Sequence, residues 1–343
     1  DVQDAIAAAR RAQPAWFHLG WERRLAILRN AAELISERLM EYAGVMAYEV
    51  GKTRMEALGE VEEVADLIRY YAKTAEDNAY YDHEMDNLGD PAVHTRSILR
   101  PHGVFAVISP FNFPMALSAG PSAAALMAGN AVVFKPASVS ALTGVILAEV
   151  YRDAGVPDGV FNLVMGPGGT VGEELQENPG IDGIVFTGSY DVGFDIFRSF
   201  SKTYPRPCIV EMGGKNTAVV LASADLEEAA EGIMRAAFGF GGQKCSANSR
   251  VYVQRPVHDE LVRLLVDKTE RLVVGNPVDR ATFLGPVIDQ HAVDRHQQAV
   301  AEARRDGTVF SGGHRLTDGD LARGTYVEPT VVGLPVTHRL FHD

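Results

Sequence analysis

The sequence contains few cysteines and no long hydrophobic run, and each scarcity narrows the class of protein. Its two cysteines, Cys208 and Cys245, are too few for a disulfide framework, and no Cys-x-x-Cys pair or His-rich metal spacing accompanies them. Because the sequence shows neither a signal-peptide pattern nor an apolar run of about twenty residues, it predicts neither export nor a membrane partner. We therefore expect a cytoplasmic protein without a metal site.

Positive charge is also scarce. The 343 residues include 32 Lys and Arg against 45 Asp and Glu, which gives a formal net charge of −13, and the cations are scattered. A nucleic-acid surface needs clustered cations, so we expect no nucleic-acid partner. The hydrophobic content of 46% is enough, at this length, for about two domains with a large core.

The two ends of the sequence lack the signals that usually begin and finish a domain. Asp1 leads directly into an amphipathic pattern without an initiator methionine, and Phe341-His342-Asp343 follows an apolar stretch without a turn or cap. We expect the chain to be a fragment of a longer protein.

Helical periodicity dominates the first eighty residues. Apolar stripes with a helical period run through 25–39 and 61–71 and are typical of helices that face a core. Residues 83–101 then become polar and strand-like without a strong apolar face, which indicates an extended hairpin that pairs outside the domain body. We expect this hairpin to form an oligomer contact in a homodimer or larger assembly.

The hydrophobic pattern changes near residue 103, where short, continuously apolar runs begin to alternate with helical segments. Such runs are typical of strands buried on both faces, and the alternation predicts an α/β fold with a doubly wound parallel sheet. A second α/β set begins with a strand at 217–220, so we expect one domain over 1–213 and another, apparently incomplete, over 214–343. The predicted strands of the first domain lie at 104–108, 131–134, 160–164, 183–186 and 208–210.

Cys245 is a candidate nucleophile because it follows Phe-Gly-Gly-Gln-Lys at 240–244, where small residues let the backbone approach a ligand closely. Taken alone, a cysteine is more often a small buried apolar residue, as we expect for Cys208 in its apolar run. Glu211 distinguishes the two cases, because it ends an apolar strand upstream of Cys245 and supplies a candidate base.

Unusual residues also follow the predicted strands, at the edge where such sheets bind ligands. Separately, Asn112 is typical of a turn and Lys135 of a solvated strand end. The segment 166–172 reads G-x-G-x-x-x-G, a weaker signal than the G-x-G-x-x-G fingerprint, at a helix start whose amides can face a pyrophosphate. Phe-Thr-Gly-Ser at 186–189 is another helix start able to hold an anion.

Together and in this order, these segments resemble the aldehyde dehydrogenase superfamily over nearly the whole chain. The resemblance implies a first domain that binds NAD or NADP, a catalytic second domain and a small-molecule aldehyde substrate. It implies Cys245 as the nucleophile, Glu211 as the base for hydrolysis and Asn112 as an oxyanion donor. The matching motifs are Pro-Phe-Asn-Phe-Pro at 110–114, Lys-Pro-Ala at 135–137, Phe-Thr-Gly-Ser at 186–189, Glu-Met-Gly-Gly-Lys at 211–215 and Gly-Gln-Lys-Cys at 242–245. The implied cofactor-binding residues are Ser109, Pro110, Phe111, Lys135, Ser138, Gly166, Gly168, Gly172, Phe186, Thr187, Gly188, Ser189, Gly193, Met212 and Gly213.

The chemistry needs these residue types. In the reaction that the resemblance implies, a Cys245 thiolate would attack the aldehyde carbonyl, and the Asn112 amide and the Cys245 backbone N–H would stabilise the resulting alkoxide. A bound nicotinamide would accept the hydride, which leaves a thioester, and Glu211 would draw a proton from the water that hydrolyses this thioester. Relatives that pass the acyl group to coenzyme A generally lack this carboxylate, so Glu211 favours hydrolysis. The alternative of a non-catalytic binding protein on this fold is disfavoured because all three residues are intact.

Specificity is less closely defined. Ser138 stands where NAD-preferring members commonly carry a glutamate, and a hydroxyl does not repel a 2′-phosphate, so NAD and NADP both remain open. The segment around Lys244 and Ser246 most resembles the glutamate-semialdehyde (pyrroline-carboxylate) dehydrogenase branch, where these two residues would hold a substrate carboxylate. A structural or solvent-facing Lys244 is an equal alternative. Arg69 departs from this branch, whose members tend to carry a glutamate there, and succinylglutamate and succinate semialdehydes are the alternative substrates. The later Glu-x-Phe-Gly-Pro motif of the family is expected past Asp343.

Overall fold

The computed structural model describes residues 1–342. Asp343, the last residue of the end expected to be truncated, lies outside them. The chain divides into two compact units. The first contains Asp1–Val45 and Leu58–Met212, and the second contains Met46–Ala57 and Gly213–Asp343. The sequence placed the division near residue 213, but nothing in it marked residues 46–57 as part of the later unit.

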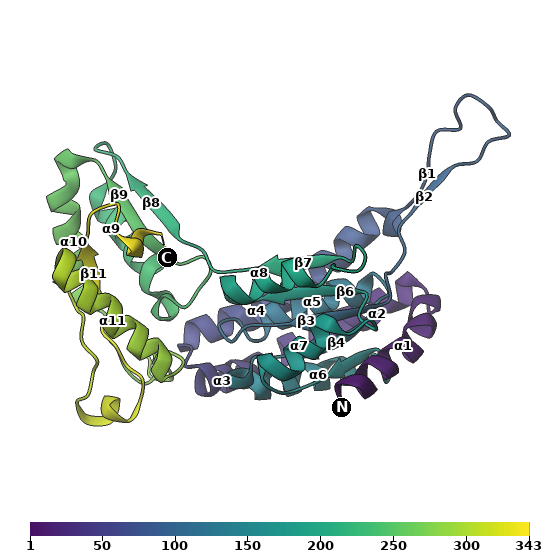
Figure 1. The fold of residues 1–343 in the computed structure, drawn as a ribbon, viewed down its shortest axis with the longest axis horizontal. Coiled ribbons are helices and arrows are strands. Elements are labelled where there is room, and N and C mark those ends of the chain that lie inside the picture. The colour runs from purple at the N-terminus through teal and green to yellow at the C-terminus, as the bar shows by residue number, and fades with distance from the viewer. Residues whose placement is uncertain (343) are drawn as a thin grey trace. The chain divides into compact units, whose positions relative to one another are not determined.

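The first unit is built on a five-stranded parallel sheet with the order β5-β4-β3-β6-β7 (Figure 1). The chain runs outward from β3 through β4 to β5, then crosses to β6 and β7 on the other side. This arrangement confirms the predicted doubly wound α/β fold. The strands are β3 (Val104–Ile108), β4 (Ala131–Lys135), β5 (Phe161–Leu163), β6 (Gly183–Thr187) and β7 (Cys208–Glu211).

Helices cover both faces of the sheet because its strands are apolar on both sides. On one face, alternate residues of β3, such as Ala106, form a core with Ile6 of α1, Leu175 of α7 and Ile196 of α8. On the other face, α5 contacts β3 and β4, and α6 contacts β5. The helices of this unit are α1 (Val2–His18), α2 (Trp21–Glu37), α5 (Ala116–Met127), α6 (Ala141–Ala154), α7 (Glu173–Glu177) and α8 (Tyr190–Ser199). Helices α3 (Leu39–Val50) and α4 (Arg54–Asp77) contain residues of both units.

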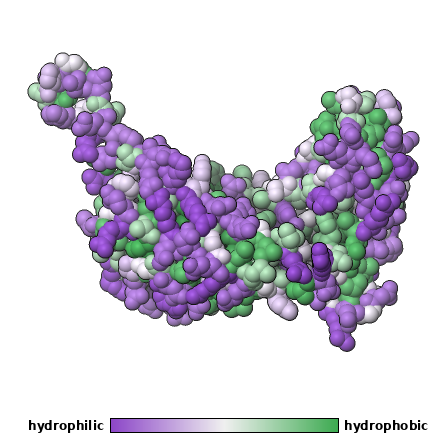
Figure 2. Space-filling view, turned by 180° about the vertical axis from the view of Figure 1, so that it is seen from behind, coloured by the Kyte–Doolittle hydropathy of each residue, from purple (hydrophilic) through white to green (hydrophobic). Residues whose placement is uncertain are grey.

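A hairpin arm extends from the first unit between α4 and β3 (Figure 1). Its strands, β1 (Asp82–Glu84) and β2 (Arg96–Ile98), pair antiparallel, with Asp82 opposite Ile98. Figure 2 shows hydrophobic residues interspersed among hydrophilic ones along the arm, and Leu88 and Ile98 are exposed.

The second unit has a smaller parallel pair, β8 (Asn216–Val220) and β9 (Asn248–Val253), covered by α9 (Leu226–Phe238) and α10 (His258–Glu270). Its core joins Val220, Ile233 and Leu261. Asp225 caps α9 by accepting a hydrogen bond from the Glu228 backbone N–H at 3.0 Å. The unit also contains α11 (Gln290–Asp306) and the antiparallel strands β10 (Thr308–Ser311) and β11 (Val331–Gly333).

Candidate active site

The sheet of the first unit brings most of the predicted cofactor residues to one edge. In the strand register, Ile108 lies opposite Lys135 on one side and Phe186 on the other, and Thr187 lies opposite Glu211. Since the strands are parallel, the segments that follow them emerge together at the carboxyl edge. The chain changes its winding direction between β3 and β6, and this switch point is where such sheets bind ligands.

The loop after β3 is firmly held. Ser109 is buried, its backbone N–H donates to the Lys135 carbonyl at 3.1 Å, and its hydroxyl accepts from Ser118 at 2.7 Å. The half-buried Pro110 and Phe111 follow, and the Asn112 side-chain oxygen accepts from the Phe113 N–H at 3.1 Å. The oxyanion role requires the other end of this amide, Nδ2, as the donor.

Lys135 is buried at the end of β4, and this burial lowers the pKa of its ammonium group. Its Nζ donates to the Pro136 carbonyl at 3.2 Å. The exposed Ser138 hydroxyl lies 3.4 Å from the Gly166 carbonyl, which connects the segments after β4 and β5. The lysine is therefore not the solvated strand-end residue that the motif alone favours.

The glycines after β5 differ in what they do. Gly166 has a φ of 155°, and a Cβ there would lie 2.5 Å from Val171, so local packing requires glycine. At Gly168 and Gly172 a Cβ would meet nothing within 4 Å, so packing does not explain these two glycines. The open space beside them fits a ligand that approaches the backbone. The helix start expected here is a π-helical turn, Gly168–Gly172, followed by the five-residue α7.

The glycines after β6 make room for neighbouring side chains. A Cβ on Gly188 would lie 2.5 Å from the Phe186 ring, and one on Gly193 would lie 2.7 Å from Met212. Ser189 is exposed just before α8. Met212 is therefore packed against α8, whereas Gly213 has open space at its Cβ position.

Glu211 is exposed at the end of β7. Its backbone carbonyl accepts from the Gly188 N–H at 3.0 Å, which ties the ends of β6 and β7 together. Cys208, at the beginning of β7, differs from Glu211 at its end. Its side chain is half-buried, and this burial raises the pKa of its thiol. A thiol with a raised pKa is a poor nucleophile, consistent with the structural role expected for Cys208.

Cys245 of the second unit is exposed on a sharply turned loop. Phe240, Gly241 and Gly242 have φ values of 51°, 62° and 74°, so the chain makes three consecutive left-handed residues before it. At Phe240, which is not glycine, this left-handed backbone conformation is strained. The buried ring of Phe240 packs beneath the fully buried Lys52, whose Nζ lies 5.0 Å from the ring centroid.

Two residues near the start of β8 fix the Cys245 backbone. A Cβ on Gly214 would lie 2.9 Å from the Cys245 carbonyl oxygen, so the second glycine of the Glu-Met-Gly-Gly-Lys motif permits this close approach. Asn216 Nδ2 donates to the same carbonyl at 2.6 Å and to the Ala247 carbonyl at 3.1 Å. Sequence reasoning identified the glycine motif but missed Asn216.

Lys244 forms an ion pair with Glu56, with Nζ 2.8 Å from Oε1, and both side chains are largely buried. A Cβ on Gly239 would come within 3.0 Å of this Glu56 oxygen, so the loop glycine makes room for the pair. Gln243 anchors the loop further, because its Oε1 accepts from the Ile288 N–H at 2.9 Å. Ser246 is exposed beside Cys245. Glu56 was missed because it lies 188 residues from its partner.

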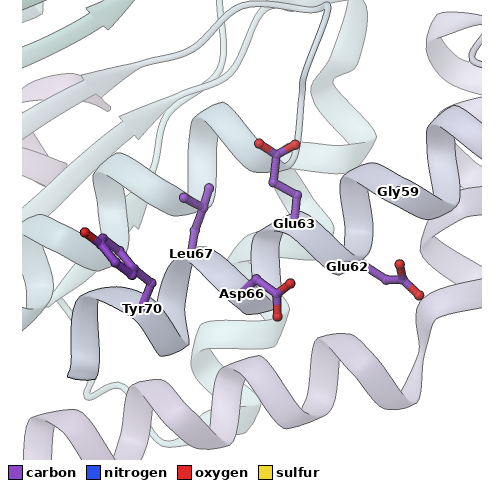
Figure 3. A pocket seen from close by; sticks show the side chains of 6 residues that line it. All are labelled: Gly59, Glu62, Glu63, Asp66, Leu67 and Tyr70. Atoms are coloured by element: carbon purple, nitrogen blue, oxygen red, sulfur yellow. The ribbon is translucent and has the colours of Figure 1, made fainter. Parts of the chain in front are cut away.

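An open depression lies on α4, and Figure 3 shows the side chains around it, all from this helix. Its lining is acidic and contains none of the predicted site residues. Arg69, on the same helix, pairs instead with Glu33 of α2 at 2.9 Å and with Asp66 at 3.6 Å. The lining residues are Gly59, Glu62, Glu63, Asp66, Leu67 and Tyr70.

The described residues 1–342 contain neither a candidate membrane-spanning helix nor a candidate metal-binding cluster. None of their helices combines the length and apolar character needed to span a bilayer. Within the same residues, no group of three or more His, Cys, Asp or Glu side chains is arranged to hold a metal ion.

Comparison with known proteins gives consistent matches. The model of the aldehyde dehydrogenase family matches residues 1–342. A 1-pyrroline-5-carboxylate dehydrogenase of Anoxybacillus flavithermus is 38% identical over 342 residues, covering 96% of this chain and 64% of the relative. The chain thus spans less than two thirds of the length of this curated relative.

Solved structures show the same similarity. A 1-pyrroline-5-carboxylate dehydrogenase from Thermus with bound NAD has a TM-score of 0.94 and 34% identity, over 100% of this chain and 66% of that one. An NADP-dependent enzyme of E. coli has a TM-score of 0.91 and 34% identity, over 99% of this chain and 69% of that one. The two neighbours are thus described with different nicotinamide cofactors.

Proposed function

The chain belongs to the aldehyde dehydrogenase family, and on this basis we propose that the whole protein oxidises an aldehyde to a carboxylic acid with NAD or NADP. The observation that carries the proposal is the presentation of Cys245, an exposed thiol on a loop whose backbone is fixed by Gly214 and Asn216. A fixed loop of this kind suits a nucleophile that must meet its substrate in one geometry.

In the proposed reaction, the Cys245 thiolate adds to the aldehyde carbonyl and forms a thiohemiacetal. Asn112 Nδ2 and the Cys245 backbone N–H donate to the developing alkoxide. When bound, the nicotinamide cofactor supplies the acceptor for the hydride that leaves this intermediate. Loss of this hydride would leave a thioester on Cys245. Glu211 then takes a proton from the water that attacks the thioester, which releases the acid and restores the Cys245 thiolate.

The residues at the carboxyl edge of the sheet fit a dinucleotide. Lys135, Thr187 and Ser189 offer donors, and the open space beside Gly168 and Gly172 lets a large anionic group reach the backbone. Ser138 supplies a hydroxyl where a carboxylate would repel a 2′-phosphate, which supports the use of both NAD and NADP. The remaining predicted cofactor residues shape this edge, as Gly193 does by admitting Met212.

We propose glutamate semialdehyde as the substrate, with succinylglutamate and succinate semialdehydes as alternatives. The 38% identity to a protein named 1-pyrroline-5-carboxylate dehydrogenase supports this choice. Ser246 beside the nucleophile is available to a substrate carboxylate. Lys244 is the other candidate for this contact, but its pairing with Glu56 reduces the charge that it can offer and favours a role in holding the loop.

A panel of aldehydes, assayed with NAD and with NADP on the full-length protein, tests the proposal. We expect activity with both cofactors and complete loss in Cys245→Ala, with dinucleotide affinity retained within a few-fold, because the thiol acts in covalent chemistry. Cys208→Ala is the matched control and should retain activity. Substantial turnover by Cys245→Ala would remove this residue from the mechanism.

A further inference from the structure

Glu60 is a buried carboxylate that binds the segment carrying Asn112. It is 2% exposed, and its Oε1 accepts from the backbone N–H groups of Met115 at 2.8 Å and Ala116 at 3.0 Å. We propose that Glu60 is a positioning residue for Asn112, which it places by fixing the start of α5. The inference rests on the proposed function, because it concerns the oxyanion donor of that reaction.

The start of α5 has no cap of its own. Its N-cap residue is Met115, whose side chain makes no capping hydrogen bond to the first turn, and Pro114 precedes it. Exposed backbone donors at a helix start need acceptors, and most helices use a local Ser, Thr, Asp or Asn. Helix α9 does so through Asp225. For α5, the acceptor comes from α4, 55 residues earlier in the chain.

A distant buried carboxylate is a costly way to cap a helix. Removing a carboxylate from water is unfavourable unless its partners compensate, and here two backbone donors and the helix dipole do so. A local cap would give comparable helix stability without this cost. In addition, the distant cap fixes the position of the loop that ends at Met115 relative to α4.

The other contacts of the loop complete this fixation. The Ser118 hydroxyl contacts Ser109 at 2.7 Å and the Pro114 carbonyl at 2.5 Å, which joins the beginning of the loop to α5. Leu117 N–H donates to the Phe113 carbonyl at 3.1 Å. Asn112 therefore lies between a start held by serine hydroxyls and an end held by Glu60.

Loss of the Glu60 charge should affect acylation more than binding. In Glu60→Gln the acceptor oxygen becomes neutral, the two bonds weaken, and the loop end gains freedom. An oxyanion donor is sensitive to small displacements, so we expect about tenfold slower acylation with a KM change of less than about twofold. The aldehyde ground state does not depend on this donor.

A double-mutant cycle tests the proposal in the full-length enzyme, with the pre-steady-state burst of reduced cofactor as the measure of acylation. We expect Asn112→Ala to slow the burst by roughly a hundredfold. Glu60→Gln should slow it about tenfold in the wild-type background but less than about twofold in Asn112→Ala, because a residue that acts through another loses its effect when that residue is removed. Asp225→Ala is the control and should lower the melting temperature without changing the burst.

Each other outcome has a definite meaning. Equal slowing by Glu60→Gln in both backgrounds would overturn the positioning role while leaving Asn112 as the oxyanion donor. A loss of less than about threefold in Asn112→Ala, below the usual cost of an oxyanion donor, would overturn the proposed role of Asn112 and the positioning role with it. If Glu60→Gln does not fold, Glu60→Asp, which keeps the charge but shortens the side chain, carries the same cycle and the same criteria.

Discussion

The role expected for Lys244, which precedes the proposed nucleophile, depends on its ion pair with Glu56. Its ammonium lies 2.8 Å from Glu56 in a largely buried pair, and Gly239 leaves room for both. A lysine paired with a carboxylate attracts a second carboxylate weakly, whereas removing either member of a largely buried pair is costly and would loosen the loop. The two roles predict different kinetics.

Lys244→Met and Glu56→Gln separate these roles. If Lys244 holds the loop, both variants should slow acylation of charged and uncharged aldehydes to a similar extent. If it holds the substrate, Lys244→Met should raise KM only for semialdehyde acids, by about tenfold or more. Glu56→Gln should then lower that KM, because the lysine charge is released. We expect the first pattern. Acylation rates and KM values, each measured with glutamate semialdehyde and with propanal, distinguish the two.

Glu211 is exposed at the end of β7, where water can reach it. Glu211→Gln should keep the burst of reduced cofactor but slow steady-state release of acid, because acylation precedes the step that needs a base. Rapid-mixing absorbance at the reduced-cofactor band measures both phases. A folded variant that shows no burst would assign Glu211 to an earlier step.

The residues that sequence reasoning found are those that stand in local motifs. Cys245, Glu211 and Asn112 each follow a recognisable strand or glycine run. Glu56, Glu60 and Asn216 do not, because their partners are a distant lysine and backbone groups of other segments. A side chain that binds a backbone group cannot be matched with its partner from the sequence, because nearly every residue carries the same backbone groups.

Helices and strands could be predicted where burial requires a recognisable pattern of apolar residues. The strands of the first unit are apolar on both faces, and each was expected within a residue or two of its position, such as β3 at Val104–Ile108. The segment after β5 was harder, because Gly166-Pro167-Gly168-Gly169 has no side-chain pattern to distinguish a helix start from the π-helical turn that it forms. Local backbone geometry here depends on glycine rather than on periodicity.

The β1–β2 arm yields a prediction about assembly. A two-stranded sheet is marginal alone, and its outer edges present unpaired backbone groups. Ile98 and Leu99 are exposed at its base. We expect Ile98→Lys combined with Leu99→Glu to reduce the mass measured by light scattering from that of an oligomer to that of a monomer. Leu142→Lys, at an exposed site on α6, is the control. An unchanged mass would show that the arm is not the oligomer contact.

At the scale of the whole chain, the order of motifs was enough to predict the family, because several motifs that occur together in one order are more specific than any one of them alone. The contents of the two units were less visible. Residues 46–57 join the second unit although they precede the first sheet. Their contribution, including Lys52 beneath Phe240, depends on contacts with a loop nearly two hundred positions away.

Substrate preference tests the proposal for the whole protein. Arg69 would disfavour an α-ammonium group if its charge were uncompensated, but Glu33 and Asp66 pair with it. We therefore expect the full-length enzyme to prefer glutamate semialdehyde over succinate semialdehyde in kcat/KM, and Arg69→Gln to change this ratio by less than about twofold, because exposed ion pairs contribute little. Competition between the two substrates, with NAD and with NADP, measures the ratio. A tenfold or greater preference for succinate semialdehyde would contradict the glutamate-semialdehyde assignment, and the oxidation of another aldehyde would remain the proposed reaction.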